Sequence, residues 1–390
     1  MEAGAVNADG LYGTALDLAK QLILGQDFHL RASEKVVELT VRGEHRVADL
    51  ATGLPGLWAI RRAREELIQQ ALSAHHLFRR DVQYIVTQGK VQIVDEYTGR
   101  VMPDRSWEGG LHQLIEAKEK CAITERNKTL ARITYQRFFR RYLHLCGMTG
   151  TAVEVSGELR AVYGLRVVRI ATNRPLKRTN CGTRIYSTAA LKWNAVVEAV
   201  KEATRNRRAV LIGTRSVDAS EHLGKLLVRD GLRPVILNAR QDHQEAEIVA
   251  GAGQPCRVTV ATNMAGRGTD ILLHSEVSEI GGLHVVLTEF HESRRIDRQL
   301  FGRAGRQGDP GSFESIVSLD DELFQRFAGK RALGIAVWLL RHAKQVPPIL
   351  GPFLKARSQS AAERTHARAR QITLSEDHRS NKTFGFSGIE

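Results

Sequence analysis

The feature that most constrains the fold is an alternation of short apolar runs with longer helical segments, which starts at about residue 209. The runs lack the polar alternation of half-exposed strands, so they are typical of strands buried on both faces. Such strands, separated by helices, predict a parallel sheet with helices on both faces. The expected strands are residues 209–213, 234–237, 258–261 and 284–288, and the expected helices are residues 216–229, 241–250 and 292–302.

The chain before this sheet has a different pattern, in which helices accompany antiparallel strands. Residues 84–100, YIVTQGKVQIVDEYTGR, predict a hairpin that turns around Gly89. After about Gly329 the chain becomes basic and helical. The other expected elements are a weak helix in residues 1–25, two strands in residues 28–47, helices at residues 57–80, 106–120 and 127–145, and a loose end at residues 376–390.

A glycine-rich string follows the strand expected at residues 258–261. The string VTVATNMAGRGTDI places Gly266 and Gly268 on either side of Arg267, before Thr269 and Asp270. Glycines after a strand let backbone N–H groups approach a phosphate, and Asp270 can accept hydrogen bonds from a ribose or orient a neighbouring arginine. Many such turns need glycine for backbone reasons alone, so the string is specific only over its full length.

A second string, HESRRIDRQLFGRAGRQGDPGS at residues 291–312, carries two arginines after a helix. Arg303 and Arg306 follow the helix face that bears Arg298 and Gln299, and the glycines around them let the backbone turn. An arginine supplied from a facing domain can clamp a γ-phosphate and accelerate phosphoryl transfer on the order of 10³-fold or more. A solvated basic helix with a glycine cap is the plain alternative. We expect both strings to lie at the carboxyl ends of strands, where parallel sheets bind ligands.

Together the two strings resemble the last motifs of superfamily 2 helicase-like ATPases. Their longer forms, NMAGRGTDI, GGLHV, HESRRID and GRAGRQGDPGS, closely resemble SecA, the ATPase that drives preproteins through the bacterial secretion channel. So do IVDEYTGRVM, WEGGLHQLIEAKE, GMTGTA and TNRP. The resemblance runs with few gaps from about Phe28 to Phe327, three quarters or more of the chain.

The resemblance implies a fold and a division into domains. It predicts a RecA-like parallel sheet flanked by helices, with an N-terminal α+β clamp and a C-terminal helical tail. Residues 1–125 then form part of the preprotein cross-linking domain, and residues 126–164 a remnant of the first nucleotide-binding domain. Residues 165–328 form the second such domain, and residues 329–390 a shortened helical scaffold with a basic tail.

The resemblance also assigns roles to the two strings. It implies that Arg303 and Arg306 are the arginine-finger pair and that the cofactor is ATP. The residues implied to contact or flank the nucleotide from this domain are Asp270, Gly268, Arg267, Thr269 and Gln307. It implies no metal ligand in this chain, because the missing first domain contributes the Mg²⁺ site.

The sequence departs from such a motor in its phosphate-binding half. Hydrolysis needs a GxxxxGK[ST] loop and a Walker B acid. The three Gly-Lys pairs, at residues 89–90, 224–225 and 329–330, are followed by valine, leucine and arginine. VQIVDE at residues 91–96 could pass for a Walker B strand, but no phosphate loop precedes it, so a charged turn after a strand is preferred. We therefore expect the chain alone not to hydrolyse ATP.

Composition limits the kinds of binding partner and the cellular location that we expect. The 57 Lys and Arg against 43 Asp and Glu give a net charge of +14, which favours an anionic partner. The four cysteines are scattered, so neither a disulfide framework nor a zinc site is expected. No segment reads as a signal peptide or a membrane span. These features fit a cytoplasmic protein that is soluble or at most attached to a membrane surface, and the resemblance to SecA implies a peripheral location at the inner membrane.

Three functions remain open from the sequence. The first is a subunit or fragment of a SecA-like translocation motor, which binds preprotein or unfolded peptide and contacts the secretion channel or an acidic membrane surface. Its first nucleotide-binding domain could come from a separate chain. The second is the C-terminal half of a superfamily 2 nucleic-acid helicase, although a nucleic-acid partner is not expected from the strings. The third is a non-enzymatic remnant that binds peptide or lipid.

Overall fold

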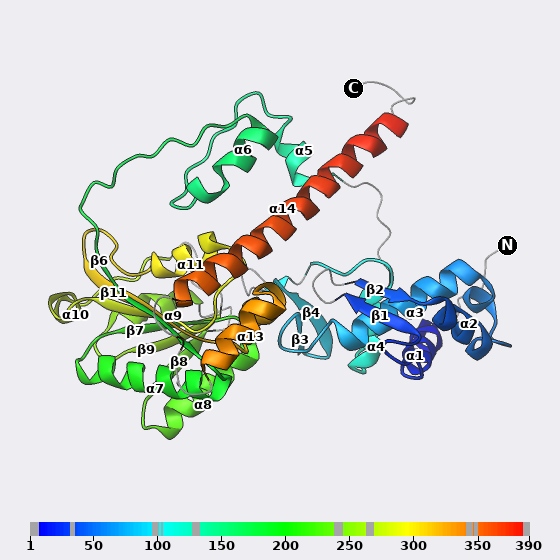
Figure 1. Cartoon of the computed structure of the whole chain (residues 1–390), viewed down its shortest axis with the longest axis horizontal. Helices are drawn as coiled ribbons and strands as arrows, with labels where there is room; N and C mark the ends of the chain where they lie inside the picture. Colours follow the sequence, from blue (N-terminus) through cyan, green and yellow to red (C-terminus); the bar gives the residue numbers. More distant parts are fainter. Residues whose placement is uncertain are drawn as a thin grey trace. The chain divides into compact units, whose positions relative to one another are not determined.

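The computed structural model describes residues 8–31, 36–95, 101–102, 104–126, 133–237, 245–262, 269–340, 346 and 350–384 (Figure 1). The chain divides into two compact units. The first comprises residues 1–129 with residues 216–218, and the second comprises residues 130–215 and 219–390. Each unit has its own sheets and its own core, and each is described separately.

The second unit is built on a six-stranded sheet in which every neighbouring pair is parallel. This confirms the parallel sheet flanked by helices that the sequence predicted. The strands, in their order across the sheet, are β6 (Lys177–Tyr186), β11 (Pro310–Ser318), β10 (Leu283–Leu287), β7 (Val210–Thr214), β9 (Val258–Thr262) and β8 (Pro234–Leu237).

Helices cover both faces of this sheet because alternate side chains of each strand point to opposite sides. On one face, Val210 and Ile212 of β7 pack in a cluster with α7 (Ala189–Arg205) and α8 (Val217–Arg229). On the other face, Leu211 packs in a cluster with Leu300 of α11 (Arg294–Phe301) and with α12 (Glu322–Phe327). Shorter helices complete the sheet's connections: α9 (Glu245–Ala250), η4 (Gly251–Gly253) and α10 (Ser275–Glu279).

Two strands of the sheet, β6 and β11, were not predicted. β6 is an edge strand with the sequence KRTNCGTRIY, and only its last two residues are buried, so it has no apolar run. β11 is largely buried, but polar side chains interrupt it. One of them, Glu314, accepts hydrogen bonds from Arg184 at 2.6 Å and pairs with His284 at 3.1 Å. Polar groups satisfied in this way can be buried at little cost, which hides the strand from a hydrophobicity pattern.

The first unit combines two small antiparallel sheets with helices. The predicted hairpin around Gly89 is present, as β3 (Tyr84–Thr87) and β4 (Lys90–Val94). Two strands were predicted in residues 28–47, and both are present, as β1 (Phe28–Arg31) and β2 (Val36–Leu39). Residues 41–47 instead begin the helix α2 (Val41–Leu50), because Thr40 caps it by accepting a hydrogen bond from the amide of Gly43. The remaining elements are α1 (Ala8–Ala19), η1 (Gly56–Ala59), α3 (Arg61–His76), β5 (Val101–Met102) and α4 (Leu111–Lys118).

The rest of the second unit lies before and after the sheet. The helix expected at residues 127–145 is much shorter, because α5 (Tyr135–Phe139) begins only after the capping residue Thr134. It is followed by η2 (Val153–Val155) and α6 (Ser156–Tyr163). After the sheet come α13 (Lys330–Leu339) and α14 (Leu350–Phe384), whose helix includes most of the end that was expected to be loose. No helix among the described residues is long and apolar enough to cross a membrane.

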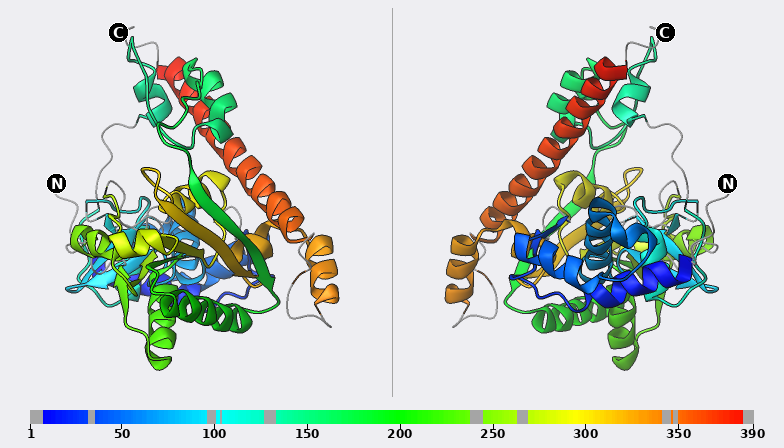
Figure 2. Two further views of the ribbon diagram at one scale, coloured as in Figure 1. Left: turned by 90° about the vertical axis from the view of Figure 1, so that its left-hand side faces the viewer. Right: turned by 90° about the vertical axis from the view of Figure 1, so that its right-hand side faces the viewer.

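The long helix α14 contacts two other parts of the second unit. Gln359 donates a hydrogen bond of 2.7 Å to Asp297 of α11. Eleven residues further along, Arg370 makes two hydrogen bonds of 2.7 Å to the carboxylate of Glu158 on α6. Figure 2 shows α14, in orange to red, extending from the sheet to the side of α6. Helix α14 therefore links α6, which lies in the segment before the sheet, to α11, the helix that precedes Arg303 and Arg306.

Candidate functional site

The arginine pair lies on a turn between α11 and β11. Helix α11 starts beyond the carboxyl end of β10 and runs back across the sheet, so the turn at residues 302–309 lies at the edge where β11 and β6 begin. We expected this string at the carboxyl ends of the strands. Its start at His291 does follow the carboxyl end of β10, but the turn that carries the two arginines lies at the opposite edge. The reason is topological: in a parallel sheet each connecting helix returns the chain to the edge where the next strand starts.

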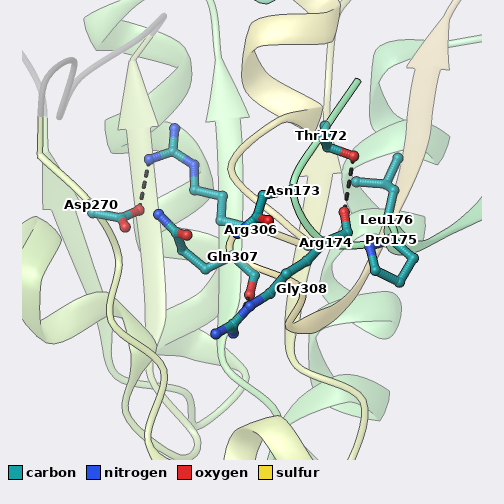
Figure 3. Close-up of a pocket in the computed structure, with 10 residues that line it drawn as sticks. Thr172, Asn173, Arg174, Pro175, Leu176, Asp270, Arg306, Gln307 and Gly308 are labelled. Carbon is teal, nitrogen blue, oxygen red and sulfur yellow. Dashed lines mark hydrogen bonds and ion pairs between the residues drawn. The ribbon is translucent and has the colours of Figure 1, made fainter. Parts of the chain in front are cut away.

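Arg306 and Asp270 form the centre of the candidate site, although 36 positions separate them in the sequence. The guanidinium of Arg306 donates to the carboxylate of Asp270 at 2.7 Å (Figure 3). Its Nε donates to the carbonyl oxygen of Gly302 at 2.9 Å. Both side chains are about two-fifths exposed. The pair therefore brings together one residue from each of the two strings, at a place that solvent can reach.

Arg303 has a different environment from Arg306. Its side chain is buried, and its Nη1 donates to the backbone carbonyl of Thr269 at 3.0 Å. The sequence had treated the two arginines as an equivalent pair. In the structure Arg303 fastens the loop that carries Asp270 to the turn that carries Arg306, whereas Arg306 faces solvent. Gly268 and Arg267, the other two predicted contacts of this loop, lie outside the described residues.

A cavity of about 390 Å³ adjoins the pair. Asp270, Arg306 and Gln307 line one part of it, so three of the predicted residues share a cavity. Arg303 and Thr269 are not among the residues that line it. The lining residues, several of them labelled in Figure 3, are Thr172, Asn173, Arg174, Pro175, Leu176, Asp270, Gly305, Arg306, Gln307 and Gly308.

The segment before β6 forms the other wall of this cavity, which sequence reasoning missed. Thr172–Pro175, the TNRP string, had entered only as part of the family resemblance, with no role. Thr172 donates from its hydroxyl to the carbonyl of Arg174 at 2.9 Å, which shapes a local turn. Arg174 then donates to the backbone carbonyl of Gln307 at 3.0 Å. This wall could have been predicted only if the pairing of β6 with β11 had been known, because that pairing brings Thr172–Pro175 beside the turn.

The exposed face of α11 contacts the turn that contains GMTGTA. Gln299 donates to the hydroxyl of Thr151 at 3.1 Å, and Arg298 donates to the carbonyl of Gly150 at 3.1 Å. Arg298 also pairs with the carboxylate of Glu154. The predicted shared helix face of Arg298 and Gln299 is thus used to hold the segment before the sheet.

The electrostatics of the site are dominated by arginine. Arg178, at the start of β6, packs against the turn. Burial lowers the pKa of its guanidinium, and the positive charge of Arg298 lowers it further. No group of three or more His, Cys, Asp or Glu side chains that could hold a metal ion occurs among the residues that the structure describes. Val91 to Val94, the first four residues of VQIVDE, lie in β4 of a three-stranded antiparallel sheet in the first unit, and not in the parallel sheet; Glu96 lies outside the described residues.

The arrangement can bind an anion next to a hydroxyl donor. A guanidinium donates two parallel hydrogen bonds to phosphate or carboxylate oxygens. A carboxylate within 3 Å of it can accept from a ribose hydroxyl once the guanidinium has turned to another acceptor. The contacts that the guanidinium and the carboxylate can make here serve to bind a ligand and to stabilise its charge.

Comparison with known proteins gives matches along most of the chain. Residues 175–277 and 272–339 match the family model of the SecA P-loop domain, and residues 7–116 match that of the SecA preprotein cross-linking domain. The matched residues contain no GxxxxGK[ST] string.

Curated relatives match nearly the whole chain. Protein translocase subunit SecA 2 of Nitrosospira multiformis is 55% identical over 377 residues, which are 97% of this chain and 56% of that protein. Protein translocase subunit SecA 3 of Magnetococcus marinus is 48% identical over 376 residues, 96% of this chain and 57% of that protein. The chain thus spans a little over half the length of these relatives.

Among solved structures, the E. coli DEAD-box protein SrmB, in a complex with RraA, aligns over 39% of this chain and 83% of that chain at 19% identity. Its TM-score is 0.30, which is too low to bear on function.

Proposed function

This chain belongs to the SecA family, and from that premise we propose that it supplies one wall of an ATP site in a protein-translocating motor. The observation that carries the proposal is the Asp270–Arg306 pair on the wall of a cavity. On ATP binding, Arg306 exchanges the carboxylate for γ-phosphate oxygens, and Asp270 accepts from the ribose. Arg303 holds the two loops together. The expected roles of Gly268, Arg267, Thr269 and Gln307 beside the nucleotide remain part of the proposal.

The phosphate cradle and the Mg²⁺ ligand come from a domain that carries GxxxxGK[ST] and an acidic Walker B string. That domain is supplied either by residues outside these 390 or by a second polypeptide. The segment before the sheet, which we propose to be the remnant of the first nucleotide-binding domain (residues 126–164), supports this. It exposes apolar side chains that a folded partner would cover: Leu143 and Met148 are 96% and 99% exposed, and Tyr135 is 70% exposed.

The remaining parts of the chain have proposed roles in transport. We assign residues 1–125 to a clamp for preprotein or unfolded peptide, residues 165–328 to the second nucleotide-binding domain and residues 329–390 to a helical scaffold. The net charge of +14 suits an acidic membrane surface beside the secretion channel, and a cytoplasmic protein that attaches peripherally to the inner membrane.

The test is reconstitution of ATP hydrolysis. The chain is mixed with a separately produced domain of a SecA relative that carries both strings, and Mg-dependent phosphate release is measured. We expect release only from the mixture, and we expect Arg306→Ala to reduce it on the order of 10³-fold. An Arg169→Ala variant, at an exposed position on the segment that leads to β6, serves as the matched control. Hydrolysis by this chain alone that survives Arg303→Ala and Arg306→Ala overturns the proposal.

The helicase alternative makes a different prediction. The relatives are translocase subunits by name, which favours transport. Filter binding of single- and double-stranded DNA and RNA over a salt series separates the two functions. Tight binding with a steep salt slope contradicts the transport proposal, because it indicates that many phosphates are neutralised.

A further inference from the structure

We propose that Arg174 and Arg178 are positioning residues that hold the backbone of the arginine turn, residues 302–308, and thereby aim Arg306 into the cavity. This inference rests on the proposed function, because it concerns the same site. Neither residue belongs to the two strings that identified the site: Arg174 lies on the segment that leads into β6, and Arg178 is the second residue of β6.

The first step is the capture of three backbone carbonyls. Arg178 donates through Nη1 to the carbonyls of Phe301 and Ala304, at 3.0 and 3.3 Å. Arg174 donates through Nη1 to the carbonyl of Gln307, at 3.0 Å. The last carbonyls of a helix have no partner within the helix. At the end of α11 the carbonyl of Phe301 accepts from the amide of Ala304, and Arg178 adds a second, charged donor. Arg174 continues the same function into the turn beyond it.

The second step concerns the glycines of the turn. A Cβ on Gly305 would lie 2.8 Å from the Cβ of Arg178, and a Cβ on Gly308 would lie 2.9 Å from the Cδ of Arg174. Both glycines also have positive φ angles, +68° and +84°. The GRAGRQG spacing thus serves a second purpose besides turning the backbone: it makes room for two arginine stems to lie against the turn. Figure 3 shows the Arg174 side chain running beside Gln307 and Gly308.

The third step is that the turn needs to be held. Gln307 has a φ of +53°, a left-handed conformation that residues with a Cβ seldom adopt. Its neighbour Arg306 is the residue whose direction matters, because a misplacement of about 1 Å at a reacting group can cost on the order of 10²-fold in rate. A clamp on the carbonyl of Gln307 therefore acts directly on the base of the Arg306 side chain.

The two arginines differ in how well they can be tested. Arg178 is half-buried and its guanidinium lies 5.6 Å from the ring centroid of Phe313, so replacing it also disturbs packing. Arg174 is exposed. Its removal should leave the stability of the fold nearly unchanged, because surface substitutions usually do. Arg174 is therefore the better probe, and Arg178→Lys is a second variant that keeps the stem against Gly305 but loses the planar fork.

The experiment uses the reconstituted mixture of chain and phosphate-loop domain. We expect Arg174→Ala to lower kcat about 10-fold or more while the KM for ATP changes by less than about 3-fold, because the lost interaction acts in the transition state. We expect Arg174→Lys to retain part of the rate. The double variant Arg174→Ala/Arg306→Ala should be no slower than Arg306→Ala alone, since residues that act as a unit are not additive.

A second readout does not depend on hydrolysis. Amide hydrogen exchange of the chain alone, followed in peptides that cover residues 302–309, should become faster in Arg174→Ala and stay unchanged in Arg169→Ala. Unchanged exchange together with an unchanged kcat overturns the inference. So do rate effects of Arg174→Ala and Arg306→Ala that multiply, because they show an independent contact of Arg174.

Failure of the proposed function gives a different result. If Arg306→Ala has no effect on hydrolysis, the ATP-site proposal fails, and exchange alone then decides the positioning inference. Faster exchange in Arg174→Ala supports a clamp on the turn, and unchanged exchange overturns it.

Discussion

Replacement of Arg303 and Arg306 by alanine should separate two roles that look identical in the sequence. Arg306 pairs with Asp270 in a place that solvent reaches. Arg303 is 8% exposed and donates to the carbonyl of Thr269. We therefore expect Arg306→Ala to reduce hydrolysis in the reconstituted mixture on the order of 10³-fold with little change in folding. We expect Arg303→Ala to destabilise the fold as well as to reduce hydrolysis.

The magnitudes follow from these environments. An exposed ion pair contributes about 0–1 kcal/mol, so Arg306→Ala should change the free energy of unfolding by less than about 1 kcal/mol. A hydrogen bond from a charged donor contributes about 1.5–3 kcal/mol, and Arg303 also buries its stem. Arg303→Ala should therefore cost about 2 kcal/mol or more. For a domain of this size, about 2–4 °C per kcal/mol gives a fall in Tm of about 4–8 °C.

Urea denaturation of the chain alone measures these changes, with the midpoint and the slope fitted together. The slope should stay constant if only stability has changed. An equal loss of stability in the two variants would refute the distinction between a buried fastener and an exposed ligand group. So would a larger loss for Arg306→Ala.

Three further predictions concern the second unit, and urea denaturation tests each. Lys192 and Asp321 form a buried ion pair at 2.5 Å, so Lys192→Met should cost about 3–5 kcal/mol by leaving a buried carboxylate that keeps its hydrogen bonds from Ser318 but has lost its countercharge; recovery in Lys192→Met/Asp321→Asn is the control, and a loss below about 1 kcal/mol contradicts it. Burial raises the pKa of Glu292, but the hydrogen bond from His366 and the charges of nearby arginines outweigh it, so the pKa is lowered. The contribution of Glu292 to the free energy of unfolding should therefore be complete above the ordinary glutamate pKa of about 4.3 and fall as the pH drops below it. The prediction is refuted if the free energy of unfolding of Glu292→Gln depends on pH as steeply as that of the unmodified chain. Gly282 has a φ of +71°, and an added Cβ would lie 1.9 Å from a backbone oxygen at the start of β11, so Gly282→Ala should cost about 3 kcal/mol or more; a variant as stable as the original shows that the turn can relax.

The parallel sheet could be predicted because its central strands are buried on both faces. In β7, β9 and β10 every residue is buried, so apolar residues predominate in these strands, although Thr259 and His284 stand among them. The hairpin could also be predicted, because two β-rich runs flank Gly89 in the sequence. In the structure both Gln88 and Gly89 have positive φ angles, as the central residues of a tight hairpin turn often do.

The contacts of the site that could not be predicted share a physical cause. They are made to backbone carbonyls, which every residue has, so the sequence does not mark them. The burial of Arg303 depends on the carbonyl of Thr269, and the contact of Arg174 depends on that of Gln307. The site's second wall was missed for the same reason, together with the polar character of β6, which conceals the strand that places Arg174 beside the turn.

The length of α14 has a mechanical consequence. Its 35 residues span about 52 Å at about 1.5 Å per residue. It is fastened to α11 through Gln359 and to α6 through Arg370, about 16 Å apart on the same scale. A tilt of about 5° about its first turn displaces its far tip by about 4–5 Å at this length. If α14 turned as one rigid rod, a small rotation beside the arginine turn would therefore be enlarged at its far end.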